Sequence, residues 1–161
     1  MTRREDLPEA ARSVVDGNAY MVLGTADPDG RPWTTPVYFG HERYAEFYWL
    51  SSPEARHSRN IAGRPEVSLV VFDSSVPIGG AQAVYMAATA ARVPDEEVPA
   101  RAEVFRTPRF PGARFFEPRE LLDGSLHLYR AVVEEHSILV RGSDPDLGRG
   151  VDSRYPVDVA D

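Results

Sequence analysis

The chain has 161 residues, 42% hydrophobic and 27% charged, which suits one globular domain and leaves too little length for a second independent core. The absence of cysteine excludes disulfides, thiolate catalysis and cysteine-ligated metals. A formal net charge of −7 argues against binding of duplex nucleic acid, which needs a basic surface, although a local basic patch for one small phosphate stays open.

The N-terminal residues 1–6 are charged, and no apolar run follows them. We therefore expect no secretory signal peptide. No stretch of the sequence approaches the length needed to span a membrane. These features predict a soluble, cytoplasmic protein without a membrane partner.

Hydrophobic spacing and turn residues predict the elements in chain order. They are a helix over 7–18, strands over 20–26, 31–39 and 46–51, a helix over 52–63, strands over 67–72 and 81–93, a helix over 95–105, a short helix over 118–122, and a hairpin of strands 126–134 and 137–141. Pro36 cannot donate a ladder hydrogen bond, so it indicates an edge, a bulge or a ligand-facing break in its strand. The run 67–72 is nearly continuous in apolar residues and is expected to be central.

This count predicts a mainly β fold: a small β-barrel of about six or seven mostly antiparallel strands with flanking helices. We expect a single domain over residues 1–161. It comprises an N-terminal helix (1–18), the barrel with its helices (19–142) and a polar C-terminal tail (143–161), in which residues 155–157 are a candidate docking segment.

The start of the helix expected over 52–63 is the most informative segment for chemistry. Ser52 suits an N-cap position, and Pro53 suits the first turn. A helix N terminus offers unpaired N–H groups and the positive end of a dipole, which together with Arg56 and His57 would suit a phosphate. The alternative is a capped surface helix with solvated basic residues, and from this segment alone that alternative is favoured.

Residues 33–38 form the second candidate, because a proline in a strand frees backbone groups that a planar polar ring could bind. The alternative is a plain edge strand. The four histidines lack the spacing of a zinc site, and no HExxH or GxSxG motif is present, so neither a metal centre nor a serine hydrolase is expected.

The order of the motifs is more specific than any one of them. A strand, the D-x-x-G turn at 27–30 and a return strand are followed by a strand ending at Ser51, the basic pair Arg56-His57, and the run N-x-x-x-R-P-x-V-S-L over 60–69. This order resembles the pyridoxamine 5′-phosphate oxidase-like, FMN-binding split-barrel family. The resemblance covers residues 19–93 well and continues more loosely through 128–131.

The resemblance implies a set of cofactor-binding residues. Those expected at the isoalloxazine ring are Thr34, Thr35, Pro36 and Val37, with Gln82 from the long strand; Leu50 and Ser51 end the third strand, and Arg56 and His57, with a hydroxyl of Ser51 or Ser52, are expected at the FMN phosphate. Two positions depart from the family pattern. His57 replaces the usual lysine and is only partly charged near neutral pH, and Thr35 replaces an arginine.

The same resemblance implies an FMN-dependent oxidoreductase that acts on a small molecule, as a homodimer with its flavin at the subunit interface. The family's full substrate-phosphate constellation is not found, so oxidation of pyridoxamine phosphate itself is not expected. No catalytic side chain is assigned. The alternatives are an 8-hydroxy-5-deazaflavin coenzyme in the same groove, or a non-catalytic flavin- or haem-binding module with His57 or His127 as a candidate haem ligand.

Overall fold

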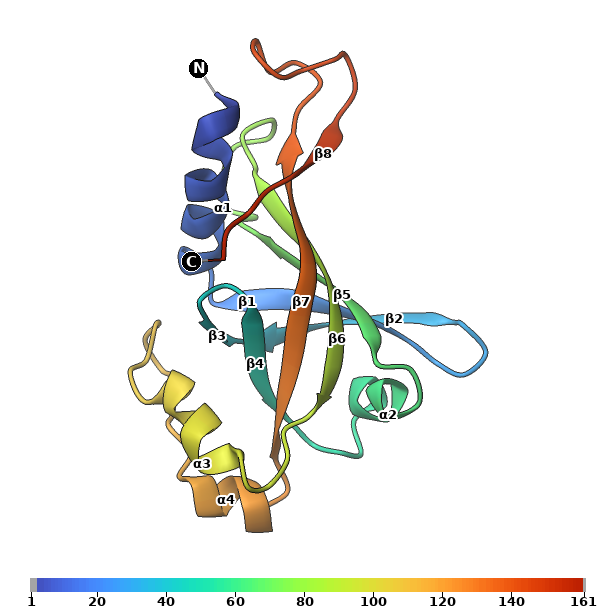
Figure 1. The fold of residues 1–161 in the computed structure, drawn as a ribbon, viewed down its shortest axis with the longest axis vertical. Coiled ribbons are helices and arrows are strands. Elements are labelled where there is room, and N and C mark those ends of the chain that lie inside the picture. Colours follow the sequence, from blue (N-terminus) through green and yellow to red (C-terminus); the bar gives the residue numbers. More distant parts are fainter. Residues whose placement is uncertain (1–2, 161) are drawn as a thin grey trace.

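A computed structural model describes residues 3–160 and shows these residues forming eight strands of one curled antiparallel sheet (Figure 1). Hydrogen-bonded neighbours follow the order β2-β1-β5-β6-β7-β4-β3, and β8 pairs with β7. The strands are β1 (Tyr20–Ala26), β2 (Pro32–Tyr38), β3 (Gly40–Glu42), β4 (Glu46–Ser51), β5 (Glu66–Phe72), β6 (Ala83–Arg92), β7 (His127–Val140) and β8 (Ser153–Pro156). The prediction of a mainly β barrel with flanking helices is therefore confirmed.

Short helices flank the sheet. They are η1 (Arg4–Asp6), α1 (Leu7–Asp16), α2 (Arg56–Gly63), α3 (Val98–Arg101), η2 (Ala102–Phe105) and α4 (Pro118–Asp123). Helix α1 buries Leu7, Ala11 and Val15 in the main core, against β5 and β6. No helix of residues 3–160 is long and apolar enough to cross a membrane.

A second, smaller core lies under the connection between β6 and β7. This connection, residues 93–126, is called the flap here and contains α3, η2 and α4. Figure 1 shows it at the lower end of the sheet, beside β4 and β7. Its buried members Val98, Phe105 and Leu121 pack with Tyr48 of β4 and Leu128 of β7. The flap is thus attached to the sheet by apolar contacts of its own.

Several local predictions are confirmed. Pro36 lies on β2, at one end of the strand order, where a missing ladder donor is tolerated. Strand β5 lies between β1 and β6, as its apolar sequence predicts. The candidate docking segment of the tail contributes β8, which pairs with β7. Two short strands, β3 and β8, raise the count above the six or seven expected.

The predicted start of the helix over 52–63 is wrong, because α2 begins at Arg56 with Ala55 at the N-cap position. The Ser52 hydroxyl instead accepts a hydrogen bond from the Glu54 N–H at 3.1 Å, and the Ser52 carbonyl accepts one from Ala55 at 3.1 Å. Serine and proline favour a tight turn as readily as a helix start, and here the turn precedes the helix.

Two further boundaries differ from the predictions. The helix expected over 95–105 is divided into α3 and η2. The hairpin expected over 126–141 is one continuous strand, β7, in which Glu134 is an extra residue: Ala87 pairs with Glu135, whereas Ala88 pairs with Val133. A bulge of this kind interrupts the alternation of buried and exposed residues, which imitates the polar turn of a hairpin.

Candidate functional site

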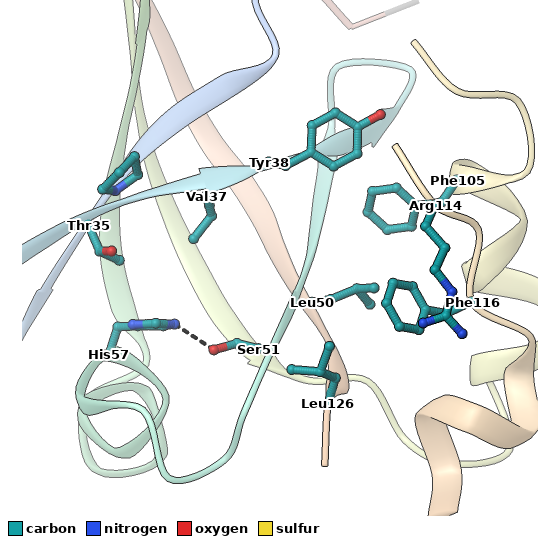
Figure 2. Close-up of a pocket in the computed structure, with 11 residues that line it drawn as sticks. Thr35, Val37, Tyr38, Leu50, Ser51, His57, Phe105, Arg114, Phe116 and Leu126 are labelled. Carbon is teal, nitrogen blue, oxygen red and sulfur yellow. Dashed lines mark hydrogen bonds between the residues drawn. The ribbon is translucent and has the colours of Figure 1, made fainter. Parts of the chain in front are cut away.

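A cavity of about 400 Å³ lies between β2, the end of β4, the first turn of α2 and the flap (Figure 2). Its volume falls in the range of small-molecule sites, about 300–1,000 Å³. The residues that line it are Thr35, Pro36, Val37, Tyr38, Leu50, Ser51, His57, Phe105, Arg114, Phe116 and Leu126. Apolar and aromatic side chains dominate this list, and polar groups lie at its two ends, as a flat ring with a polar substituent requires.

Strand β2 forms one side of the cavity. Pro36 pairs with Val22 of β1 in the antiparallel register, and Thr35, Pro36 and Val37 all reach the cavity. Thr34, also expected at the flavin ring, is exposed and does not line the cavity. The strand is exposed or half-buried at every position from Pro32 to Tyr38, so this structure leaves both its faces accessible.

One polar end of the cavity is formed by Ser51 and His57, and the other by Arg114. The His57 Nε2 atom lies 2.6 Å from the Ser51 Oγ atom, and the buried hydroxyl of Ser58 donates to the same oxygen at 3.2 Å. Since burial disfavours the charged imidazolium, the pKa of His57 is lowered from its ordinary value. In this geometry a neutral imidazole can accept a hydrogen bond from the Ser51 hydroxyl. An anion bound beside the imidazole would favour its charged form.

The first turn of α2 lies beside this polar end. No side chain of residues 3–160 caps the helix N terminus, so its first N–H groups are not used by a capping residue. The helix is held in place by Asn60, whose buried amide donates to the Thr25 hydroxyl of β1 at 3.0 Å. The helix end is thus fixed relative to β1 and β2 and can serve as a donor for an anion.

Arg56 does not line the cavity in this structure. Its guanidinium stacks on Trp33 of β2, 4.3 Å from the ring centroid, and lies 3.9 Å from the Asp27 carboxylate. It is nevertheless the first residue of α2 and is adjacent in sequence to His57. A phosphate at the helix end would be reached by rotation of this half-exposed side chain.

The remaining expected residues lie elsewhere. Ser52 forms the turn before α2 and does not line the cavity. Gln82 lines a separate hollow with Gly80 and Arg141, at the connection between β5 and β6. The structure therefore brings Thr35, Pro36, Val37, Leu50, Ser51 and His57 together around one cavity and places Thr34, Ser52, Arg56 and Gln82 outside its lining.

Sequence reasoning missed the flap's contribution to the site. Phe105, Arg114, Phe116 and Leu126 lie 23 to 44 residues after Gln82, the last cofactor-binding residue predicted from the sequence, and the segment 107–116 has no regular secondary structure. The only sequence signal was a concentration of phenylalanine in an irregular segment. Phenylalanine is more often buried than exposed, and here Phe105 and Phe116 line the cavity.

No group of three or more potential ligands for a metal ion occurs within residues 3–160. His127, a candidate haem ligand, lies outside the cavity lining, with its Nδ1 atom 3.0 Å from the Leu121 carbonyl oxygen.

Comparison with known proteins identifies the family of the chain and agrees with its fold. A family model described as pyridoxamine 5′-phosphate oxidase matches residues 7–134, which is most of the chain. The chain belongs to the pyridoxamine 5′-phosphate oxidase family. The pyridoxine/pyridoxamine 5′-phosphate oxidase of Bacteroides thetaiotaomicron is 30% identical over 132 residues, covering 80% of this chain and 59% of the relative. The chain thus spans less than two thirds of that enzyme's length.

Several solved structures share the fold of this chain at lower sequence identity. A haem-binding protein from Mycobacterium smegmatis matches with a TM-score of 0.64 and 20% identity, over 96% of this chain and 60% of its own. An FAD-binding protein from Mesorhizobium loti matches with a TM-score of 0.61 and 19% identity, over 81% of this chain and 90% of its own. An F420 reductase matches with a TM-score of 0.58 and 20% identity, over 78% of this chain and 94% of its own. These three proteins of similar fold are described with different ligands, so the fold alone does not identify the cofactor.

Proposed function

We propose that the cavity binds FMN and that this protein is a flavin-dependent oxidoreductase acting on a small molecule. The observation that carries the proposal is the convergence of β2, the end of β4 and the start of α2 on one cavity with apolar sides and a polar end. An isoalloxazine ring needs flat apolar surfaces, and a phosphate needs N–H and cationic donors. Both are present in that arrangement.

The residues divide between these two tasks. Val37, Leu50 and Phe116 offer apolar contact to the ring, and backbone groups near Pro36 offer polar contact to its edge. Ser51, His57 and the first N–H groups of α2 would hold the phosphate, with Arg56 joining them by rotation. When bound, FMN supplies hydride transfer between a donor and an acceptor, while the chain supplies orientation and electrostatics.

A homodimer is part of this proposal. Edge strand β2 carries Trp33, which is 39% exposed, and none of its residues is buried. A second copy placed over β2 would cover this strand and close the open side of the cavity. Sedimentation at micromolar concentration checks this point, and a strictly monomeric species would contradict it.

Two alternatives use the same cavity. A deazaflavin coenzyme with an acidic tail would draw on Arg114 and on Arg119, which lines the adjoining hollow. A haem module is less well supported, because His57 is engaged by Ser51 at 2.6 Å and His127 lies outside the cavity lining.

The deciding experiment titrates the purified full-length chain with FMN, FAD, deazaflavin coenzyme and haemin, each followed by absorbance and fluorescence. FMN is expected to bind most tightly. Anaerobic reduction of the bound flavin by NADH or NADPH, followed by reoxidation by an acceptor, is expected for an enzyme. Tight binding without reduction would favour a non-catalytic module. Failure to bind FMN would remove the proposal.

A further inference from the structure

A second hollow, of about 460 Å³, adjoins the candidate cofactor cavity on the flap side. It is lined by Phe116, Arg119, Glu120, Asp123, Gly124, Ser125 and Leu126. Phe116 and Leu126 line both spaces, so the two spaces meet at these side chains. Figure 2 shows these two side chains together at the flap side of the cavity, away from His57.

Phe116 is held in this shared position by a neighbouring ion pair. The Arg114 guanidinium stacks on its ring, 4.2 Å from the centroid, and pairs with the Glu120 carboxylate. Arg114 lines the first cavity and Glu120 the second, so the ion pair crosses from one space to the other beside the ring. Glu120 also accepts the Glu117 N–H at 2.8 Å, which fixes its carboxylate at the start of α4.

The two other charged side chains of the second hollow are unpaired. Within residues 3–160, Arg119 and Asp123 form no ion pair or side-chain hydrogen bond, although they are four residues apart on α4 and line the same space. The flap arginines Arg106 and Arg114, by contrast, each pair with a glutamate. The hollow thus combines an apolar floor, an available cation and an available anion.

We propose that this second hollow is the substrate compartment and that it binds a small aromatic molecule carrying both a carboxylate and an amino group. The aromatic body would lie on Phe116 and Leu126, directly beside the cofactor cavity. Arg119 would bind the carboxylate, and Asp123 the amino group. This inference deepens the proposed function and rests on it, because that proposal places the flavin in the neighbouring cavity.

The test compares three probes: phenylalanine, phenylacetate and phenethylamine, which carry both charges, only the negative charge and only the positive charge. Binding is measured by isothermal titration calorimetry on the flavin-free full-length chain and by the absorbance of bound flavin on the FMN-loaded chain. Phenylalanine is expected to bind most tightly. Arg119→Gln should weaken phenylalanine and phenylacetate by about ten-fold and leave phenethylamine unchanged, and Asp123→Asn should do the reverse.

The neighbouring phenylalanine is a matched control for the apolar floor. Phe115 also packs on the smaller core and lies under an arginine, Arg106, at 4.3 Å, but it lines neither space. Phe116→Ala should weaken all three probes by about ten-fold, and Phe115→Ala by less than about two-fold. Phe116→Leu, which keeps an apolar side chain and a folded flap, should lie between these values.

Three results would overturn the inference: phenylalanine binding no tighter than the singly charged probes, equal effects of the two phenylalanine variants, or charge variants that act on all probes alike. A chain that binds no FMN but still shows the expected calorimetric pattern would refute the proposed function and leave the compartment standing. A chain that binds FMN but none of the probes would refute the compartment alone.

Discussion

The imidazole of His57 and the hydroxyl of Ser51 meet at 2.6 Å, one from the first turn of α2 and the other from the last residue of β4. This contact joins two segments that the sequence places on either side of a turn, and it closes the polar end of the cavity. His57 is half-buried there, and its pKa is lowered because burial disfavours the imidazolium. Its charge state therefore depends on the pH and on any anion bound beside it.

Folding stability should reflect this lowered pKa. The unfolded chain takes up a proton at His57 near the ordinary value of 6.5, whereas the folded chain resists protonation until lower pH. The contribution to stability is thus complete above pH 6.5 and is lost as the pH falls toward the lowered pKa. The free energy of unfolding from urea melts should fall more steeply between pH 7 and pH 5 in the native chain than in His57→Gln. His41 and His136 titrate in the native chain and in His57→Gln alike, so their contributions cancel in the comparison. Equal slopes in the two proteins would therefore contradict the prediction.

Cofactor affinity should show the opposite trend if His57 contacts the phosphate. A bound phosphate raises the pKa of His57, so FMN binding takes up a proton and tightens as the pH falls from 8 to 6.5. Riboflavin lacks the phosphate and should show little pH dependence. Fluorescence titrations of both ligands, on the native chain and on His57→Gln, measure this. A riboflavin profile that matched the FMN profile would exclude phosphate contact as the cause.

Arg56 is expected to be the dominant cation at the phosphate, although it stacks on Trp33 in this structure. Loss of a hydrogen bond to a charged group costs about 1.5–3 kcal/mol. Arg56→Ala should therefore weaken FMN binding by about ten- to a hundred-fold and leave riboflavin binding nearly unchanged. Arg64→Ala is the control, because Arg64 follows α2 and donates to the Pro28 carbonyl at 3.1 Å. Equal losses for FMN and riboflavin would show that Arg56 supports the fold instead.

The sequence predicted those parts of the site that local rules determine. The strand carrying Pro36 and the strand ending at Ser51 follow from alternation, aromatic content and proline chemistry. The start of α2 could not be located, because Ser52 and Pro53 favour a turn and a helix start about equally. The structure places the turn first and leaves the helix end without a side-chain cap. The segment is therefore better suited to an external anion than the predicted capped helix.

The parts that could not be predicted depend on contacts distant in sequence. The continuous β7 contains a bulge at Glu134, and a bulge depends on the partner strand as much as on its own sequence. The approach of Phe116 to Leu50 and Ser51 depends on how the flap packs. No periodicity within residues 107–116 determines that packing. For these segments tertiary contacts override local preference.

Asn60 should matter for stability more than its polar side chain suggests. Its amide donates to Thr25 at 3.0 Å, and both side chains are almost fully buried. Asn60→Ala would leave the Thr25 hydroxyl without this donor, at a cost of about 1–3 kcal/mol. Urea unfolding measures the loss, with Asn18→Ala as a control: Asn18 also donates one amide hydrogen bond, to the Val14 carbonyl at 2.8 Å, but lies nearer the surface. FMN affinity should fall in Asn60→Ala, because α2 is less firmly held.

Arg109 connects the flap to the rest of the molecule. Its guanidinium donates to the carbonyls of Phe39, Val15 and Asn18 at 2.9, 2.8 and 3.2 Å, and it stacks on the Phe39 ring at 4.5 Å. These carbonyls lie in the last turn of α1, in the connection from α1 to β1 and directly after β2, so one side chain fixes the base of the segment that continues to Phe116. Desolvation lowers the pKa of Arg109, but its ordinary value is so high that the group stays charged.

Replacing Arg109 should therefore destabilise both fold and site. Arg109→Gln leaves several carbonyls without a charged donor and is expected to cost about 2–4 kcal/mol in urea unfolding. Arg109→Lys should recover only part of this, because an ammonium group cannot reproduce the planar stacking on Phe39. Arg106→Gln is the matched control: Arg106 is an exposed flap arginine that pairs with Glu103, and its loss should change the urea midpoint much less than Arg109→Gln does. If Arg106→Gln proved as damaging as Arg109→Gln, the anchoring role would belong to the flap's charge as a whole and not to the carbonyl contacts of Arg109.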